Sequence, residues 1–314
     1  MEDLRIVSLI ASATEIVAAL GLQENLIGRS HECDFPTSVK ALPSCSSSEV
    51  DKDATSNKID QQVRSMVRDA LSVYQVDYAL LSDLAPTHIL TQTQCEVCAV
   101  TLDEVNRALQ QFQSTPNVIA LEPMTVEGIW RDIQAVADIA NVSSRGHALV
   151  TQLQERLIAI AKQTALRETT PTVACIEWME PLMYAANWVP ELITIAGGQP
   201  ILGQSGTHSD YFEFSELVRS DPDYMLIMPC GFEIDRSLKE MAPLTKRPLW
   251  SSLTAVRNHQ VYLIDGNHFF NRPGPRIVES AEIAAEILHP KLCNFKHKDR
   301  AYTPLTQLHE ASGY

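Results

Sequence analysis

The stretch that decides the fold is SSRGHALVTQLQERLIAIAKQTAL, residues 143–166. Ser143 or Ser144 can cap the start of a helix there, and the helical pattern ends before Pro171. At ~1.5 Å per residue, about twenty-two residues form a rod of roughly 33 Å. Apolar residues recur in it at steps of three and four, the period of one helix face: Leu149, Leu153, Leu157, Ile160 and Ala161.

Strand-like and helix-like segments alternate on both sides of this helix. Residues 5–9 have the pattern of a buried strand, and a capping-box spacing over 12–15 opens a helix that ends at Gly21. Residues 44–60 are polar and predict a surface loop, followed by a helix and a helical turn around 76–81. After Pro290 no periodicity is evident.

This alternation predicts an α/β protein with two Rossmann-like lobes joined by one long backbone helix, and a ligand cleft between the lobes. The predicted boundaries are an N-terminal lobe at 1–124, a helical connector at 125–168, a C-terminal lobe at 169–290 and a tail at 291–314.

Composition narrows the classes of partner. The chain has 314 residues, with 25 Lys and Arg against 39 Asp and Glu, for a net charge of −14. Such an excess of acid argues against nucleic acid or an anionic membrane as the main partner. No run of about eighteen apolar residues is present, so no membrane span is expected.

The first residues and the cysteines favour a cytoplasmic protein over a periplasmic one. The N-terminal stretch begins with acidic residues, and Glu15 interrupts its apolar run, so it does not have the pattern of a signal peptide. No lipoprotein-type cysteine follows it. Seven cysteines is an odd number in a chain large enough to fold without disulfides, which favours a reducing compartment.

Unusual residues gather where predicted strands end, and in open α/β sheets ligands bind beyond the carboxyl ends of the strands. Trp178, Trp188 and Tyr184 near Glu177 suit a flat or hydrophobic ligand with a polar edge, although these aromatic residues could equally pack the lobe. The predicted ligand-binding residues are Ser12, Thr14, His31, Glu177, Trp178, Trp188, His208, Phe232, His268 and Arg276.

A second constellation combines His31-x-Cys33 with Cys95-x-x-Cys98. Three thiols and an imidazole suit tetrahedral zinc, and three cysteines could also hold an iron–sulfur cluster. Two alternatives stay open: buried thiols that line a pocket, and a redox disulfide between Cys95 and Cys98. No hydrolase, Walker-type or dinucleotide-binding motif is present.

Three motifs resemble the class III substrate-binding proteins of ABC importers: RIVSLIASATEIVAALGL at 5–22, WVPELITIAGG at 188–198 and DPDYMLIMPCGF at 221–232. The resemblance covers about residues 4–290 and is strongest to the cobalamin-binding branch. HECDFP at 31–36 and CEVCAV at 95–100 resemble a soluble sub-branch.

The resemblance implies two Rossmann-like lobes, a stiff backbone helix, a monomer and a small-molecule ligand clamped between the lobes. The superfamily takes up cobalamin, iron–siderophores and haem, and some relatives bind zinc or manganese. The zinc and manganese receptors use histidines and carboxylates, so their ligand roles do not transfer to the cysteines of this chain.

The leading hypothesis is a non-enzymatic binding protein for cobalamin or a related metal chelate. One alternative is a cytoplasmic metalloprotein or metalloenzyme that holds zinc or iron with His31, Cys33, Cys95 and Cys98, with Glu177 as its acid or base. Another is an interaction module that docks to a transporter component.

Overall fold

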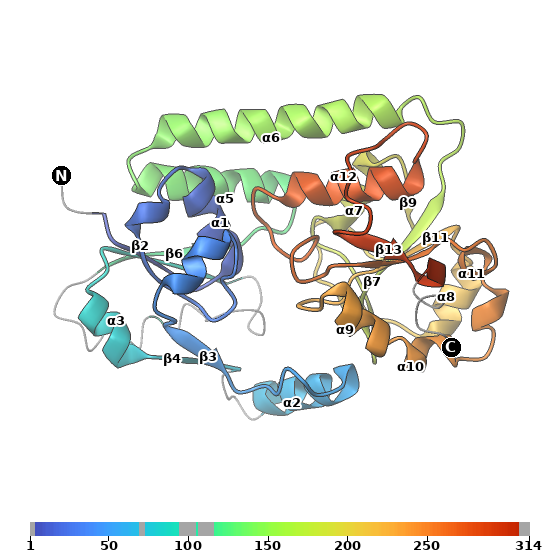
Figure 1. Ribbon diagram of the computed structural model, residues 1–314, viewed down its shortest axis with the longest axis horizontal. Coiled ribbons are helices and arrows are strands. Elements are labelled where there is room, and N and C mark those ends of the chain that lie inside the picture. Colours follow the sequence, from blue (N-terminus) through green and yellow to red (C-terminus); the bar gives the residue numbers. More distant parts are fainter. Residues whose placement is uncertain (1–3, 69–72, 94–104, 106–115, 308–314) are drawn as a thin grey trace. The chain divides into compact units, whose positions relative to one another are not determined.

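A computed structural model of the chain describes residues 4–68, 73–93, 105 and 116–307. These residues form two compact units (Figure 1). The first unit comprises residues 1–54, 58–123 and 127–152, and the second comprises 55–57, 124–126 and 153–314. The predicted α/β class is confirmed, since each unit combines a sheet containing parallel strands with helices.

The first unit is built on a parallel sheet with the strand order β2-β1-β5-β6. Its buried core includes Val7 and Leu9 from the first strand segment, Cys45, Leu81 and Ile89. The strands and helices of this part of the chain are β1 (Ile6–Ser8), α1 (Ala11–Ala19), β2 (Leu26–Arg29), β3 (Ser46–Ser48), α2 (Ser56–Arg68), β4 (Tyr74–Val76), α3 (Tyr78–Leu84), β5 (His88–Gln92), β6 (Asn117–Leu121) and α5 (Val126–Ile139), with short 3-10 helices at Gln23–Asn25 and Thr37–Ala41.

The long helix α6 spans Ser143–Thr164, so the predicted helix over 143–166 is present and ends two residues earlier. The boundary between the two units falls within it. Its buried side chains Leu153, Leu157, Ile160 and Thr164 are spaced by four, three and four residues, which is the spacing of one helix face. None of the helices in the described ranges is long and apolar enough to span a membrane.

The second unit has a larger mixed sheet with the order β10-β8-β7-β11-β12-β13, and β9 pairs with β7. The strands β7, β11 and β12 are parallel neighbours, so their carboxyl ends lie at one edge of the sheet. Helices α7 and α12 lie side by side (Figure 1). The elements are β7 (Thr172–Met179), β8 (Leu182–Tyr184), α7 (Val189–Ile195), β9 (Gln199–Pro200), β10 (Asp210–Tyr211), α8 (Phe214–Ser220), β11 (Tyr224–Ile227), α9 (Ile234–Lys239), α10 (Ala242–Thr245), α11 (Thr254–Arg257), β12 (Val261–Ile264), α12 (Ile277–Leu288) and β13 (Tyr302–Pro304), with a short 3-10 helix at Trp250–Ser252.

The structure differs from the sequence-based expectation in several segments: α1 begins at Ala11 without the predicted capping box, and α2 begins at Ser56, inside the predicted loop. The polar stretch predicted as a surface loop contains β3, which pairs with β4 through Ser46 and Val76. The three serines of β3 carry no apolar alternation, so their pattern gives no strand signal. The segment after Pro290 contains β13, which pairs with β12.

The buried carboxylate of Glu286 on α12 fastens this last segment. It accepts hydrogen bonds from the backbone amides of Phe295 (2.8 Å), His297 (3.2 Å) and Lys298 (3.3 Å) and from the Tyr302 hydroxyl (3.1 Å). Four donors on one carboxylate satisfy the groups that the chain buries when it folds back on α12.

Glu286→Gln is therefore expected to lower the free energy of unfolding by about 1–3 kcal/mol, because an amide oxygen and an NH2 group cannot accept from all four donors. Urea unfolding measures the loss, and faster proteolysis after Pro290 locates it. Glu279→Gln on the same helix is the matched control, since Glu279 is paired at 3.8 Å with the exposed side chain of Arg300. Equal stability of both variants would contradict the assigned role.

Candidate functional site

The predicted ligand-binding residues divide between the units. Ser12, Thr14 and His31 belong to the first unit. The second unit contains Glu177, Trp178, Trp188, His208, Phe232, His268 and Arg276.

In the second unit, the carboxyl ends of β7 and β11 bring an aromatic pair together. Trp178 lies near the end of β7 and Phe232 in the turn after β11, with ring centroids 5.1 Å apart and planes tilted by 55°. The backbone also joins these ends, because the Cys230 amide donates to the Glu177 carbonyl at 3.2 Å. This edge of the sheet therefore presents a tilted aromatic pair.

Gly266 explains how the turn after β12 reaches the same edge. Its amide donates to the Phe232 carbonyl at 2.9 Å. A Cβ atom at position 266 would lie 2.2 Å from the Pro229 carbonyl oxygen, so only glycine permits this approach of two backbones. Three strand ends consequently meet in one place.

Glu177, the residue before Trp178 in β7, is partly buried. The Ser209 hydroxyl donates to Glu177 Oε2 at 2.8 Å. Burial disfavours the charged carboxylate and raises its pKa to about 7, although the Ser209 hydrogen bond opposes this shift. Trp178 Nε1 is buried and has no hydrogen-bond partner among the residues that the structure describes. An indole N–H thus adjoins the aromatic surface, and a carboxyl group with a raised pKa lies at the same end of β7.

Two residues that the sequence-based analysis did not single out support Phe232. The Arg236 guanidinium lies 4.9 Å from the Phe232 ring centroid and 3.4 Å from the Glu240 carboxylate. Glu240 in turn accepts from the amide and the hydroxyl of Ser56, the first residue of α2, at 2.9 and 3.0 Å. Phe232, Arg236 and Glu240 are spaced by four residues, and this spacing in the sequence indicates that their side chains lie next to one another.

The other predicted residues of the second unit have different surroundings. Trp188 is only 4% exposed, and its indole N–H donates to the Phe270 carbonyl at 2.7 Å, so it packs the interior of the unit. His208 is exposed in its loop. His268 Nδ1 lies 2.8 Å from Asp265, and the Arg276 guanidinium lies 5.5 Å from a neighbouring aromatic ring.

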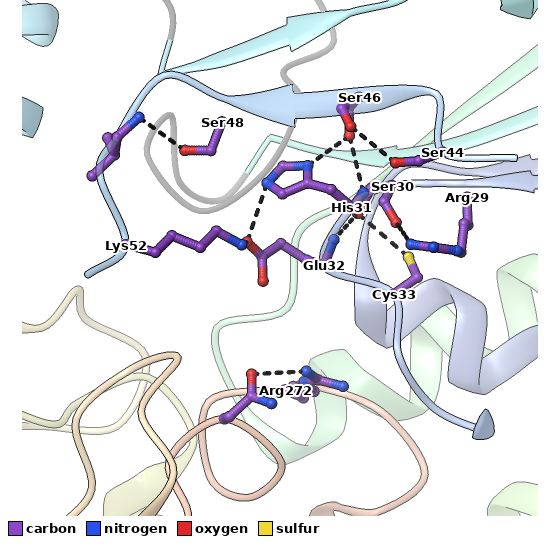
Figure 2. Close-up of polar contacts among 12 residues, drawn as sticks. Arg29, Ser30, His31, Glu32, Cys33, Ser44, Ser46, Ser48, Lys52 and Arg272 are labelled. Carbon is purple, nitrogen blue, oxygen red and sulfur yellow. Dashed lines mark hydrogen bonds and ion pairs between the residues drawn. The ribbon is translucent and has the colours of Figure 1, made fainter. Parts of the chain in front are cut away.

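In the first unit, His31 bridges two polar partners, as Figure 2 shows. Its Nδ1 lies 2.9 Å from Ser46 Oγ, and its Nε2 lies 3.1 Å from Glu32 Oε1, which also pairs with Lys52. Burial alone would raise the pKa of Glu32, but the hydrogen bonds from His31 and Lys52 outweigh it and lower the pKa to about 2. Glu32 is therefore a carboxylate throughout the physiological pH range.

Cys33 faces a separate group of partners (Figure 2). Its buried Sγ lies 2.9 Å from Thr14 Oγ1, 3.4 Å from Ser30 Oγ and 3.7 Å from the Ser8 carbonyl. In residues 4–68, 73–93, 105 and 116–307, no three His, Cys, Asp or Glu side chains are grouped so as to hold a metal ion. Cys95 and Cys98 of the predicted metal site lie outside the described residues, so the zinc or iron site stays a prediction.

The raised pKa of Glu177 predicts a pH dependence of stability. Between pH 4.5 and about 7 the folded carboxyl group holds a proton that the unfolded chain releases, so its contribution falls as pH rises through this window. We expect Glu177→Gln, which still accepts from Ser209, to be more stable than the wild type by about 1–2 kcal/mol near pH 8 and equal to it near pH 4.5.

Urea unfolding at the two pH values measures this difference. Asp132→Asn is the matched control in the first unit, since burial also raises the pKa of Asp132 to about 7. Asp132 is present in both the wild type and the Glu177→Gln protein. Its pH-dependent contribution to the free energy of unfolding therefore cancels when these two proteins are compared. A Glu177→Gln effect that is the same at both pH values would show that Glu177 is not protonated near neutral pH.

Comparisons with known proteins extend these observations. The chain matches the periplasmic binding protein family over residues 6–267. One relative is the uncharacterized ABC transporter substrate-binding lipoprotein YvrC of Bacillus subtilis, which is 22% identical over 296 residues, or 92% of this chain and 81% of that protein.

Three solved structures are similar to this one. The periplasmic heme-binding protein RhuT of Roseiflexus sp. RS-1 in apo form has a TM-score of 0.66 and 19% identity, covering 91% of this chain and 98% of that chain. The vitamin B12 binding protein BtuF of Vibrio cholerae has a TM-score of 0.64 and 19% identity, covering 90% and 96%. A periplasmic heme binding protein of Pseudomonas aeruginosa has a TM-score of 0.69 and 18% identity, covering 92% and 93%. At these identities the likeness establishes the fold.

The prediction of a cytoplasmic protein is wrong. The matched family and the solved relatives are periplasmic, and the Bacillus subtilis relative is a lipoprotein, all of which point to an extracytoplasmic location. The cysteine count misled because burial can protect a thiol in any compartment. Cys45, Cys175 and Cys293 are buried free thiols, and burial raises the pKa of Cys45 to about 11, which leaves little reactive thiolate.

The predicted resemblance to substrate-binding proteins is confirmed by these findings. The family match extends from the first strand of the first unit to the turn after β12 in the second, and so includes most of both units. The chain therefore belongs to the periplasmic binding protein family.

Proposed function

We propose that this chain is the substrate-binding protein of an ABC transporter and that it binds a planar metal chelate, a corrinoid or a porphyrin. The observation that carries the proposal is the Trp178–Phe232 pair at the carboxyl ends of β7 and β11. A tilted aromatic pair offers both a ring face and a ring edge to a flat ligand, and such contacts add to the hydrophobic gain from burial.

Polar groups next to the aromatic pair suit the rim of such a ligand. The indole N–H of Trp178 is available as a donor within the described part of the chain. Glu177, whose pKa is raised to about 7, can in its neutral form donate a hydrogen bond to an amide or carboxylate oxygen. A corrinoid carries amides at its rim and a haem carries carboxylates, so both classes fit this chemistry.

Relatives support the same class of ligand and the transporter partner. The solved relatives from Roseiflexus and Pseudomonas aeruginosa bind heme, and the one from Vibrio cholerae binds vitamin B12. The Bacillus subtilis relative is described as an ABC transporter substrate-binding lipoprotein. By analogy, the partner of this chain is the membrane component of such a transporter.

Absorbance titration of the full chain tests the proposal with four probes: haemin, cyanocobalamin, metal-free protoporphyrin and cobalt or zinc ions. We expect saturable binding of haemin or cyanocobalamin with a Kd of about 1 μM or tighter. Failure of both chelates would overturn the proposal. Stoichiometric binding of the free ions alone, lost in Cys95→Ser, would instead favour the metal site of His31, Cys33, Cys95 and Cys98.

A further inference from the structure

The start of α1 occupies a special position in the sheet of the first unit. The strand order is β2-β1-β5-β6, and α1 connects β1 to β2 on one side while β5 lies on the other side of β1. From the carboxyl end of β1 the chain continues toward β2, whereas the strand that follows β5 in the sequence, β6, lies on the opposite side of the sheet. In open α/β sheets, this is where the ends of adjacent connections diverge and leave room for a ligand.

The first turn of α1 has backbone donors without helical acceptors. The first N–H groups of any helix have no partner within it. Here the residue before the helix is Ile10, which provides no side-chain cap. Ala11, Ser12 and Ala13 are buried, with exposed fractions of 8%, 2% and 0%. Three buried amides at the positive end of a helix dipole form a site with a preference for negative charge.

Ser12 provides the second, independent observation. Its side chain is 2% exposed, and its hydroxyl has no hydrogen-bond partner among the described residues. Cα–Cβ bonds tilt toward the N-terminus of a helix, so the hydroxyl at the second helical position is directed toward the open amides. A buried hydroxyl without a partner indicates that another molecule completes the site.

The neighbouring hydroxyl groups behave differently. Thr14 Oγ1 lies 2.8 Å from Ser8 Oγ, and Ser8 Oγ donates to the Ile10 carbonyl at 3.0 Å. These groups satisfy one another and hold the turn between β1 and α1 in place. Ser12 is therefore the hydroxyl of this turn that remains for a ligand.

We propose that the N-terminus of α1 and the Ser12 hydroxyl bind a carboxylate group, a site within the first unit that goes beyond the proposed function. A carboxylate accepts from two or three amides and a hydroxyl at once. The N-terminus of a helix carries about half a positive charge, which a singly charged group balances more closely than a doubly charged phosphate does.

The test uses acetate, methyl acetate and inorganic phosphate as probes, with backbone amide NMR of the full chain as the readout. We expect acetate to shift the amide signals of residues 11–13 saturably and methyl acetate to leave them unchanged. Ser12→Ala should weaken acetate binding by about fivefold, whereas Ser12→Thr, which keeps the hydroxyl, should retain it. Ser143→Ala, at the exposed start of α6, is the control for serine removal.

Three outcomes would overturn the inference: no saturable acetate shift, equal shifts with methyl acetate, or unchanged acetate binding in Ser12→Ala. The first would mean that only water completes the Ser12 site. If phosphate bound more tightly than acetate, the assignment of a singly charged group would be wrong. Because no chelate is used, these results stand whether or not haemin and cyanocobalamin bind.

Discussion

Trp188→Ala is expected to lower the free energy of unfolding by about 3–5 kcal/mol, the range for truncating a buried tryptophan. The side chain is 4% exposed at the start of α7, and its N–H donates to the Phe270 carbonyl at 2.7 Å. Phe270 is itself buried in a left-handed conformation with φ of 66°. Truncation would leave a large cavity and a carbonyl without its donor, so two costs add.

Urea unfolding with two variants separates these costs. Trp188→Phe keeps most of the ring but removes the N–H, and we expect it to lose about 1–2 kcal/mol. A loss below about 1 kcal/mol in Trp188→Ala would show that Trp188 does not anchor the turn after β12. In that case its predicted role as a ligand-stacking residue would become the better explanation.

Trp178→Ala is expected to weaken binding of the chelate by about thirtyfold, or about 2 kcal/mol, while leaving the fold intact. Trp178 is partly exposed, unlike Trp188, and contacts Phe232 at the carboxyl ends of β7 and β11. Its loss removes both an aromatic face and the indole N–H that has no hydrogen-bond partner in the described residues. Titration with haemin and cyanocobalamin measures the effect.

Trp178→Phe is the matched variant, since it keeps an aromatic face and removes the N–H. We expect it to lose less affinity than Trp178→Ala. Circular dichroism and urea unfolding verify that both variants fold. Unchanged affinity in a folded Trp178→Ala protein would exclude the aromatic pair as the ligand-contacting surface.

The parts of the fold that depend on local periodicity could be predicted from the sequence. The apolar spacing around Leu153 and Leu157 produced a helix that differs from α6 by two residues at one end. Glycine at position 21 ends the first helix region with φ of 73°, as the C-cap pattern indicates. Such features can be predicted because they depend only on residues that are close together in the sequence.

The parts that depend on long-range contacts could not be predicted in this way. β3 is a run of serines whose pairing with β4 compensates for the absence of an apolar face. Glu240 caps the start of α2 through Ser56, a residue 184 positions away. The unpartnered hydroxyl of Ser12 likewise becomes evident only once its neighbours Ser8 and Thr14 are seen to bond to each other.

The candidate site shows the same division. The rule that ligands bind at the carboxyl ends of strands selected Glu177 and Phe232, which the structure places at one edge of the sheet. It could not distinguish Trp178 from Trp188, because residue type does not report burial. Exposure and hydrogen bonding make that distinction.

Hydrogen exchange of the full chain with and without bound haemin or cyanocobalamin tests the central claim most directly, because it locates the ligand. The proposed function predicts slower exchange in residues 177–179 and 229–232, at the carboxyl ends of β7 and β11. Bound chelate with unchanged exchange in both segments would contradict the claim.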